Sequence, residues 1–115
     1  MKITLKGEQP WSWNKLYSGA HWSIRANEAD RVHGLIREAV KGYKVLEAPV
    51  DITITAYFRT RPQDADNILS KLYIDGMKGI VIKDDNPEYV RSVTTKSRKD
   101  LLRPRVEIDI TYASE

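Results

Sequence analysis

The sequence predicts an α+β fold in which a single-layer mixed sheet carries two helices on one face. Apolar and polar side chains alternate with period two near both ends and in the middle of the chain, and segments of helical period lie between these stretches. The predicted order is therefore β-α-β-α-β-β. Of the 115 residues, 41% are hydrophobic and 30% are charged, which is usual for a folded chain. This length suits one domain, and we expect it to span residues 1–115.

The N-terminal part predicts a short strand followed by an irregular segment. In residues 1–6, Ile3 and Leu5 alternate with polar side chains, as in a half-buried strand. Residues 7–22 show no sustained period and hold all three tryptophans of the chain, Trp11, Trp13 and Trp22. We expect these rings to pack as a lid or against a partner subunit, or else to stack on nucleobases.

A helix and a strand are predicted next. From about residue 23 to residue 42, apolar side chains recur at i, i+3, i+4, i+7 and i+8, and Gly42 is placed to end the helix. These apolar positions are Val32, Leu35, Ile36, Ala39 and Val40. Residues 51–58, DITITAYF, alternate strictly and predict a strand with its apolar side chains facing the core.

The C-terminal half predicts one helix and two strands. The helix is expected from residue 66 to about residue 77, and its buried side chains are expected to be Leu69, Leu72 and Tyr73. Residues 89–96 and 105–112 are predicted strands. One face of the last strand is expected to consist of Val106, Ile108, Ile110 and Tyr112.

The net charge of +3 is unevenly distributed along the chain. Residues 1–62 hold ten basic and six acidic side chains, residues 63–90 hold three and six, and residues 91–115 hold six and four. An acidic centre between basic flanks suits a polyanion that is bound by the flanks while a cation lies at the centre. A solvated charged surface is the alternative interpretation.

The absence of cysteine excludes disulfides, a zinc site with Cys ligands and a thiol nucleophile. No apolar run approaches the roughly 20 residues that span a bilayer, and the N-terminus has no signal-like apolar core. We therefore expect no membrane partner and a cytoplasmic location.

The carboxylates form two clusters, Asp64 and Asp66 in PQDADNILSK and Asp84 and Asp85 in KDDN. In an extended segment, residues i and i+2 point the same way, so Asp64 and Asp66 are predicted to converge on one cation. Oxygen ligands without Cys or His neighbours favour a hard cation, which predicts Mg²⁺, with Mn²⁺ as a substitute, rather than Zn²⁺. No small-molecule cofactor is expected.

A lysine and two polar residues follow the first cluster. Asn67, Lys71 and Asp75 recur every four residues and are predicted to share one stripe of the helix. Lys71 is the candidate to stabilise developing charge or to orient a water molecule. Because a bound divalent cation polarises a phosphoryl oxygen and activates water, the pattern predicts phosphodiester hydrolysis. The alternative is that Asp64 and Asp66 only cap the helix.

These motifs resemble the RusA family of Holliday-junction resolvases, small metal-dependent endonucleases of phages and prophages. The resemblance rests on DADN at 64–67, on Lys71, on Asp75-Gly76 and on KDDNPEYV at 83–90. A looser match is the Asn-x-x-Tyr loop, formed here by Asn14 and Tyr17. The resemblance spans most of the chain.

The resemblance implies a homodimer that binds a four-way DNA junction and nicks two opposed strands symmetrically, in recombination and repair. It implies that Asp64, Asp66 and Asp85 bind Mg²⁺, with Asp84 in support, and that Lys71 is needed for catalysis. The expected DNA contacts are Asn14, Lys15, Asn67, Arg98, Lys99 and Arg103, the last three from a segment with six basic residues and one acidic residue (91–105). A second candidate DNA surface consists of Lys15, Arg25 and Arg31.

One spacing departs from the family pattern, in which many members have two residues between the Asn and the Lys. Here Ile68, Leu69 and Ser70 separate them, which on a continuous helix rotates Lys71 by about 100°. Either the helix starts differently or the role of Lys71 is altered. Two other functions stay open: a metal-dependent nuclease acting on other branched or single-stranded DNA, and a non-catalytic nucleic-acid-binding module.

Overall fold

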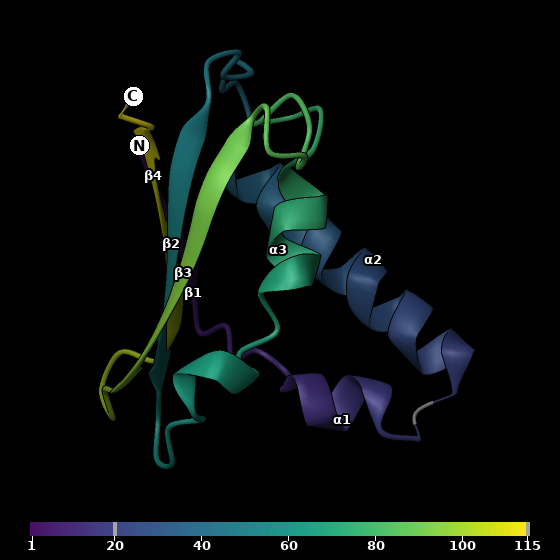
Figure 1. The fold of residues 1–115 in the computed structure, drawn as a ribbon. Helices are drawn as coiled ribbons and strands as arrows, with labels where there is room; N and C mark the ends of the chain where they lie inside the picture. The colour runs from purple at the N-terminus through teal and green to yellow at the C-terminus, as the bar shows by residue number, and fades with distance from the viewer. Residues whose placement is uncertain (20, 115) are drawn as a thin grey trace.

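The computed structural model describes residues 1–19 and 21–114, and this part of the chain contains one open sheet of four strands (Figure 1). They are β1 (Lys2–Lys6), β2 (Val50–Phe58), β3 (Val90–Lys99) and β4 (Arg105–Tyr112), in the spatial order β1-β4-β2-β3. β4 pairs antiparallel with both β1 and β2, whereas β2 and β3 are parallel. The predicted α+β class and the mixed sheet are confirmed.

The helices lie on one side of this sheet (Figure 1). They are α1 (Trp13–Tyr17), α2 (Trp22–Ala39), α3 (Ser70–Met77) and a 3₁₀ turn, η1 (Ala65–Asn67). The two expected helices correspond to α2 and α3. The expected irregular segment is wrong in part, because it contains α1. That helix forms because Ser12 caps it, accepting a hydrogen bond from the Lys15 N–H at 3.0 Å, and because Leu16 is fully buried.

The core lies between the sheet and the helices. Alternate side chains of β2 and β4 are buried there, as the period-two pattern predicts, and the opposite face of the sheet is polar. Three expected core positions are wrong. Tyr112 is 67% exposed, because the covered part of β4 ends at Ile110, and Leu35 and Ala39 are on the solvent side of α2.

The second helix begins later than the sequence predicts. α3 starts at Ser70, while Ile68 is extended and forms an isolated bridge with Ser12. Ile68 and Leu69 are both buried, so the chain enters the core in extended form before it turns into the helix. Within α3, Gly76 lies against α2, where an added Cβ would be only 3.1 Å from Cδ2 of His33. The glycine therefore lets the two helices approach closely.

A partly buried ionic network joins the N-terminal segment to α2 and α3. Arg31 makes two hydrogen bonds to Glu8, at 2.8 and 3.0 Å, and two to Glu28, at 2.7 and 2.8 Å. Glu8 also accepts a hydrogen bond from the Tyr73 hydroxyl at 2.7 Å. The hydrogen bonds that Arg31 donates to Glu28 and Glu8 raise the pKa of Arg31, and burial followed by the Glu8 charge raises the pKa of Tyr73. Arg31 therefore serves the fold, and the alternative DNA surface of Lys15, Arg25 and Arg31 stays a prediction.

None of the helices in residues 1–19 and 21–114 has the length and apolar character that crossing a membrane requires.

Candidate active site

Asp64 and Asp66 lie in the loop that connects β2 to α3. Asp64 precedes η1 and Asp66 lies within it, and the Thr95 hydroxyl of β3 donates a 2.6 Å hydrogen bond to the carbonyl of Ala65. This bond fixes the acidic turn against the sheet. The expected extended segment is wrong in part, since Asp64 is extended but Ala65–Asn67 form a 3₁₀ turn. The convergence of the two carboxylates on one cation stays a prediction.

The carboxylates of Asp64 and Asp66 are exposed and have no hydrogen-bond or ion-pair partner in the described residues. Asp64 is the cap residue of η1, but its side chain makes no capping hydrogen bond. The cap residue of α3 is Leu69, which has no capping side chain. The alternative that these aspartates serve only as helix caps is therefore wrong.

An N-terminal strap, residues 8–14, is hydrogen-bonded to the acidic loop, which is the segment 59–69 between β2 and α3. The side-chain amide of Gln9 donates to the carbonyl of Tyr57 at 3.0 Å and accepts from the N–H of Arg59 at 3.2 Å. Gln9 thus binds the backbone at the end of β2, where the loop begins. The amide of Gln63, next to Asp64, donates to the carbonyl of Pro10 at 2.7 Å.

The strap also binds the far end of the loop. Ser12 bridges to Ile68, and the N–H of Asn14 donates to the side-chain oxygen of Asn67 at 3.4 Å. The start, middle and end of the acidic loop are therefore all bonded to one segment. Sequence reasoning missed this role of Gln9 and Gln63, because neither residue belongs to a local pattern.

Lys71 and Asp75 share one side of α3, as predicted, and their charged groups are 3.4 Å apart. Asn67 lies outside the helix, so its predicted place on the same stripe is wrong. The expected rotation of Lys71 by about 100° assumed a continuous helix. Because Ile68 and Leu69 are not helical, that argument does not apply here.

The second acidic cluster lies beyond the other end of α3. The ammonium of Lys78 is 3.7 Å from Asp84 and 3.5 Å from Asp85. The N–H of Asp85 donates to the Asp84 carboxylate at 2.8 Å, and this bond, followed by Lys78, lowers the pKa of Asp84. The charge of Asp85 is the main cause that raises the pKa of Lys78.

The two clusters flank α3, whose eight residues span about 12 Å. Within residues 1–19 and 21–114, no group of three or more His, Cys, Asp or Glu side chains is placed to bind a metal ion. In kind, the donor atoms fit Mg²⁺, because all are carboxylate oxygens and those of Asp64 and Asp66 have no other partner. The metal ligands stay a prediction.

The basic DNA-contact candidates lie on different surfaces. Lys99 pairs with Phe58 in the parallel register and shares its covered face, whereas Arg98 pairs with Tyr57 on the open face. Arg103 lies in the connection between β3 and β4. The ammonium of Lys15 lies over the Trp11 ring, 4.1 Å from its centre.

The three tryptophans do not act as one unit. Trp11 and Trp13 pack partly against the core, and the Trp13 ring stacks on Tyr17 with centroids 5.4 Å apart. Trp22, at the start of α2, is 67% exposed. The N-terminal pair therefore anchors the strap, and Trp22 is available to a partner.

Comparison with known families identifies one match. Residues 25–111 match the family model described as Endodeoxyribonuclease RusA. No curated protein gives a significant match. The matched range covers well over half of the 115 residues and contains both acidic clusters, α3 and the strands β2, β3 and β4. The chain therefore belongs to the RusA family of endodeoxyribonucleases.

Proposed function

We propose that this protein is a Mg²⁺-dependent endonuclease that acts as a homodimer and resolves four-way DNA junctions by paired, symmetric nicks. The family is one of Holliday-junction-resolving endonucleases that act on branched DNA. The observation that carries the proposal is the pair of free carboxylates, Asp64 and Asp66, held on a braced loop after a parallel strand. Crevices outside the carboxyl ends of parallel strands are common sites of chemistry.

In this proposal, Asp64, Asp66 and Asp85 hold the cation, with Asp84 in support. A bound Mg²⁺ supplies polarisation of the scissile phosphoryl oxygen and lowers the pKa of a bound water. Asp84 and Asp85 form ion pairs with Lys78. A cation bound by these two carboxylates would therefore replace the Lys78 ammonium as their partner. The N-terminal strap keeps the acidic turn in place during the reaction, because it bonds the loop at three points.

Lys71 acts on the phosphate itself. Its ammonium is half-exposed and contacts only the Asp75 carboxylate, so it is able to reach a phosphate bound beside the loop. A positive charge there stabilises the negative charge that develops on the phosphoryl oxygens in the transition state. Asn14 and Asn67, which contact each other, place amide donors at the same edge of the loop.

DNA affinity should fall steeply with salt, because phosphate contacts release condensed counterions. We expect neutralisation of Arg98 and Lys99 together to flatten the slope of log affinity against log salt by about two units. The two side chains lie on opposite faces of β3, which is an edge strand of the sheet. If the DNA contacts both faces of this strand, each single variant should flatten the salt slope by about one unit. Fluorescence anisotropy over a salt series measures the slope, and an unchanged slope would place the DNA elsewhere.

The substrate is tested with labelled synthetic DNA in Mg²⁺. A four-way junction, a flap, a single strand and a linear duplex of matched sequence are compared at equal protein concentration. We expect cleavage of the junction in preference to the others, with nicks in two opposed strands at equivalent positions, because a two-fold dimer presents two sites to one centre. Equal cleavage of flap or single strand would favour a nuclease of broader specificity, and tight binding without any cleavage would favour a binding module.

A further inference from the structure

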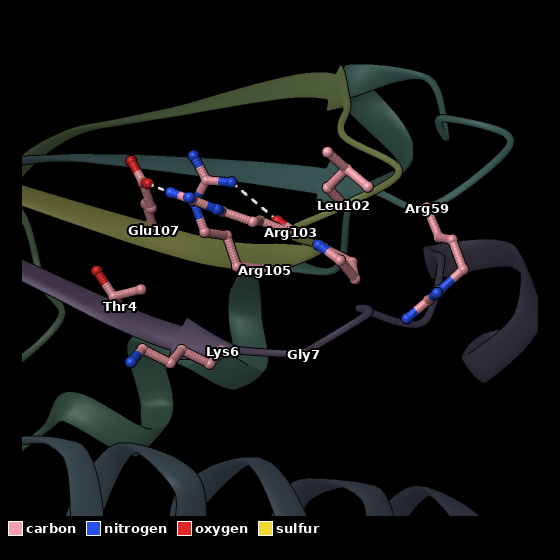
Figure 2. Close-up of a pocket in the computed structure, with 9 residues that line it drawn as sticks. Thr4, Lys6, Gly7, Arg59, Leu102, Arg103, Arg105 and Glu107 are labelled. Atoms are coloured by element: carbon pink, nitrogen blue, oxygen red, sulfur yellow. Dashed lines mark hydrogen bonds and ion pairs between the residues drawn. The ribbon is translucent and has the colours of Figure 1, made fainter.

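A basic cleft of about 680 Å³ lies where β1 ends and the connection from β3 to β4 enters β4 (Figure 2). Its cations come from separate elements: Lys6 from β1, Arg59 from the residue after β2, Arg103 from the β3–β4 connection and Arg105 from the start of β4. Glu107 is the one carboxylate among its lining residues. The cleft therefore has four positive charges and one negative charge.

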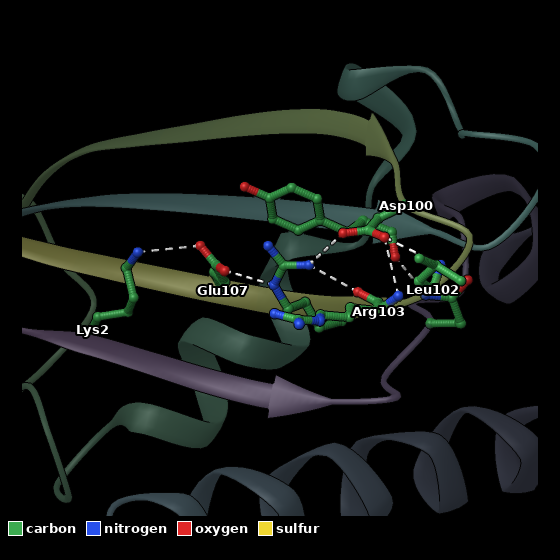
Figure 3. A network of polar contacts seen from close by, with 8 residues as sticks. Lys2, Asp100, Leu102, Arg103 and Glu107 are labelled. Atoms are coloured by element: carbon green, nitrogen blue, oxygen red, sulfur yellow. Dashed lines mark hydrogen bonds and ion pairs between the residues drawn. The ribbon is translucent and has the colours of Figure 1, made fainter.

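Two of these charges are already neutralised by the fold. Arg105 donates to Glu107 at 2.6 Å and to Asp100 at 3.0 Å, and its guanidinium stacks over the Tyr57 ring at 3.7 Å (Figure 3). Glu107 also lies 3.3 Å from the ammonium of Lys2. Arg105 and Glu107 thus form a fixed floor for the cleft.

The other three cations have no such partner. The side chains of Lys6, Arg59 and Arg103 make no hydrogen bond or ion pair with an acceptor in the described part of the chain. All three are exposed. The cleft therefore offers three free positive charges to an anion from solution.

The spacing of these charges indicates a polyanion rather than a single anion. Lys6 pairs with Arg105 on β4, and Arg105 pairs in turn with Tyr57 on β2, two residues before Arg59. Neighbouring strands lie about 4.8 Å apart, so β1 and β2 are separated by about 10 Å. One phosphate does not bridge that distance, whereas duplex DNA carries a charge about every 1.7 Å of its axis.

We propose that this cleft binds the phosphate backbone of a duplex DNA arm, with Lys6 and Arg59 as contacts in addition to Arg103. Arg59 begins the loop that leads to Asp64, and its backbone N–H donates to Gln9 at 3.2 Å, so one cation of the cleft and the acidic aspartates belong to one connected segment. The open polar face of the sheet thereby becomes part of the DNA surface. The inference rests on the proposed function only in taking the arm to belong to a junction.

The test compares two double variants that each remove two positive charges. Lys6→Ala with Arg59→Ala alters the cleft, and Arg37→Ala with Lys44→Ala is the matched control, because both control cations are exposed, have no ion pair and lie away from the cleft. Binding of a labelled junction and of a linear duplex is measured by anisotropy in EDTA over a salt series. We expect the cleft variant to lose about two units of salt slope on both DNAs, and the control to keep the wild-type slope.

Four further outcomes bear on the proposal. Lys6→Arg with Arg59→Lys should restore the slope, because the charges are kept. Inorganic phosphate at matched ionic strength should not displace the DNA; displacement that the cleft variant abolishes would indicate a site for one free phosphate and overturn the proposal. Equal slopes for cleft variant and control would also overturn it. If the cleft variant loses salt slope and the control does not, but the wild-type protein never cleaves a junction, the result would support DNA binding by the cleft and contradict the proposed function.

Discussion

Asp66→Asn should reduce junction cleavage on the order of a thousandfold, because loss of a metal ligand removes several kcal/mol of transition-state stabilisation. Junction binding should stay close to that of the wild type. Asp66 is exposed, its side chain makes no hydrogen bond or ion pair within the described residues, and its charge repels phosphate, so replacement by the isosteric amide should disturb neither fold nor DNA contacts. Single-turnover cleavage in Mg²⁺ and anisotropy in EDTA measure the two effects separately.

The matched control is Asp30→Asn, which neutralises another exposed carboxylate without a partner, on α2. It should leave cleavage unchanged. Asp85→Asn extends the test to the second cluster, and it should cause a loss comparable to that of Asp66→Asn if both clusters hold the same cation. Parallel loss of binding and cleavage in Asp66→Asn would count against the metal assignment, and full activity of Asp85→Asn would exclude Asp85 from the ligands.

Arg31→Ala should lower the free energy of unfolding by about 3 kcal/mol, because it leaves Glu8 and Glu28 buried without their cation. The lower end of the usual range for broken buried pairs applies, since the side chain of Arg31 is 43% exposed and water reaches the vacated space. The loss should also weaken the N-terminal strap, because Glu8 is its first residue. Urea denaturation monitored by tryptophan fluorescence measures the change in midpoint.

Arg37→Ala is the control on the same helix, because Arg37 is exposed and forms no ion pair. It should change stability by less than about 0.5 kcal/mol. Tyr73→Phe removes one hydrogen bond to Glu8 and should cost about 1 kcal/mol. An Arg31→Ala protein as stable as the Arg37→Ala protein would show that the network does not stabilise the fold.

The sheet and the two long helices were predictable because their patterns are local and strong. β2 and β4 alternate almost without interruption, and Val32 and Ile36 of α2, with the C-cap residue Val40, recur at spacings that a helix brings together. α1 was missed because it has five residues and a single buried side chain, Leu16, which no period reveals. The start of α3 was misplaced because Ile68 is held in extended form by a backbone bridge to Ser12, which lies 56 positions earlier in the chain.

The candidate residues of the site could be named from the sequence, but the contacts that support them could not. Asp64, Asp66 and Lys71 are singled out by residue type and by the family resemblance, and their roles stay predictions. The strap depends on Gln9 and Gln63, whose partners lie about 50 positions away in the chain. The ion pair of Arg31 with Glu8 was likewise not predictable, because a sequence does not show that Glu8 folds back onto α2.

The most direct test of the account is junction cleavage under one cation at a time, after the protein has been freed of metal by chelation. The account predicts activity in Mg²⁺ and in Mn²⁺, which accept the same hard oxygen ligands. In Ca²⁺ it predicts DNA binding with little hydrolysis, because longer and looser coordination misplaces the attacking water. In Zn²⁺ it predicts little activity, because the proposed ligands include neither Cys nor His. Full activity in EDTA, or activity restored by Zn²⁺ alone, would contradict the account.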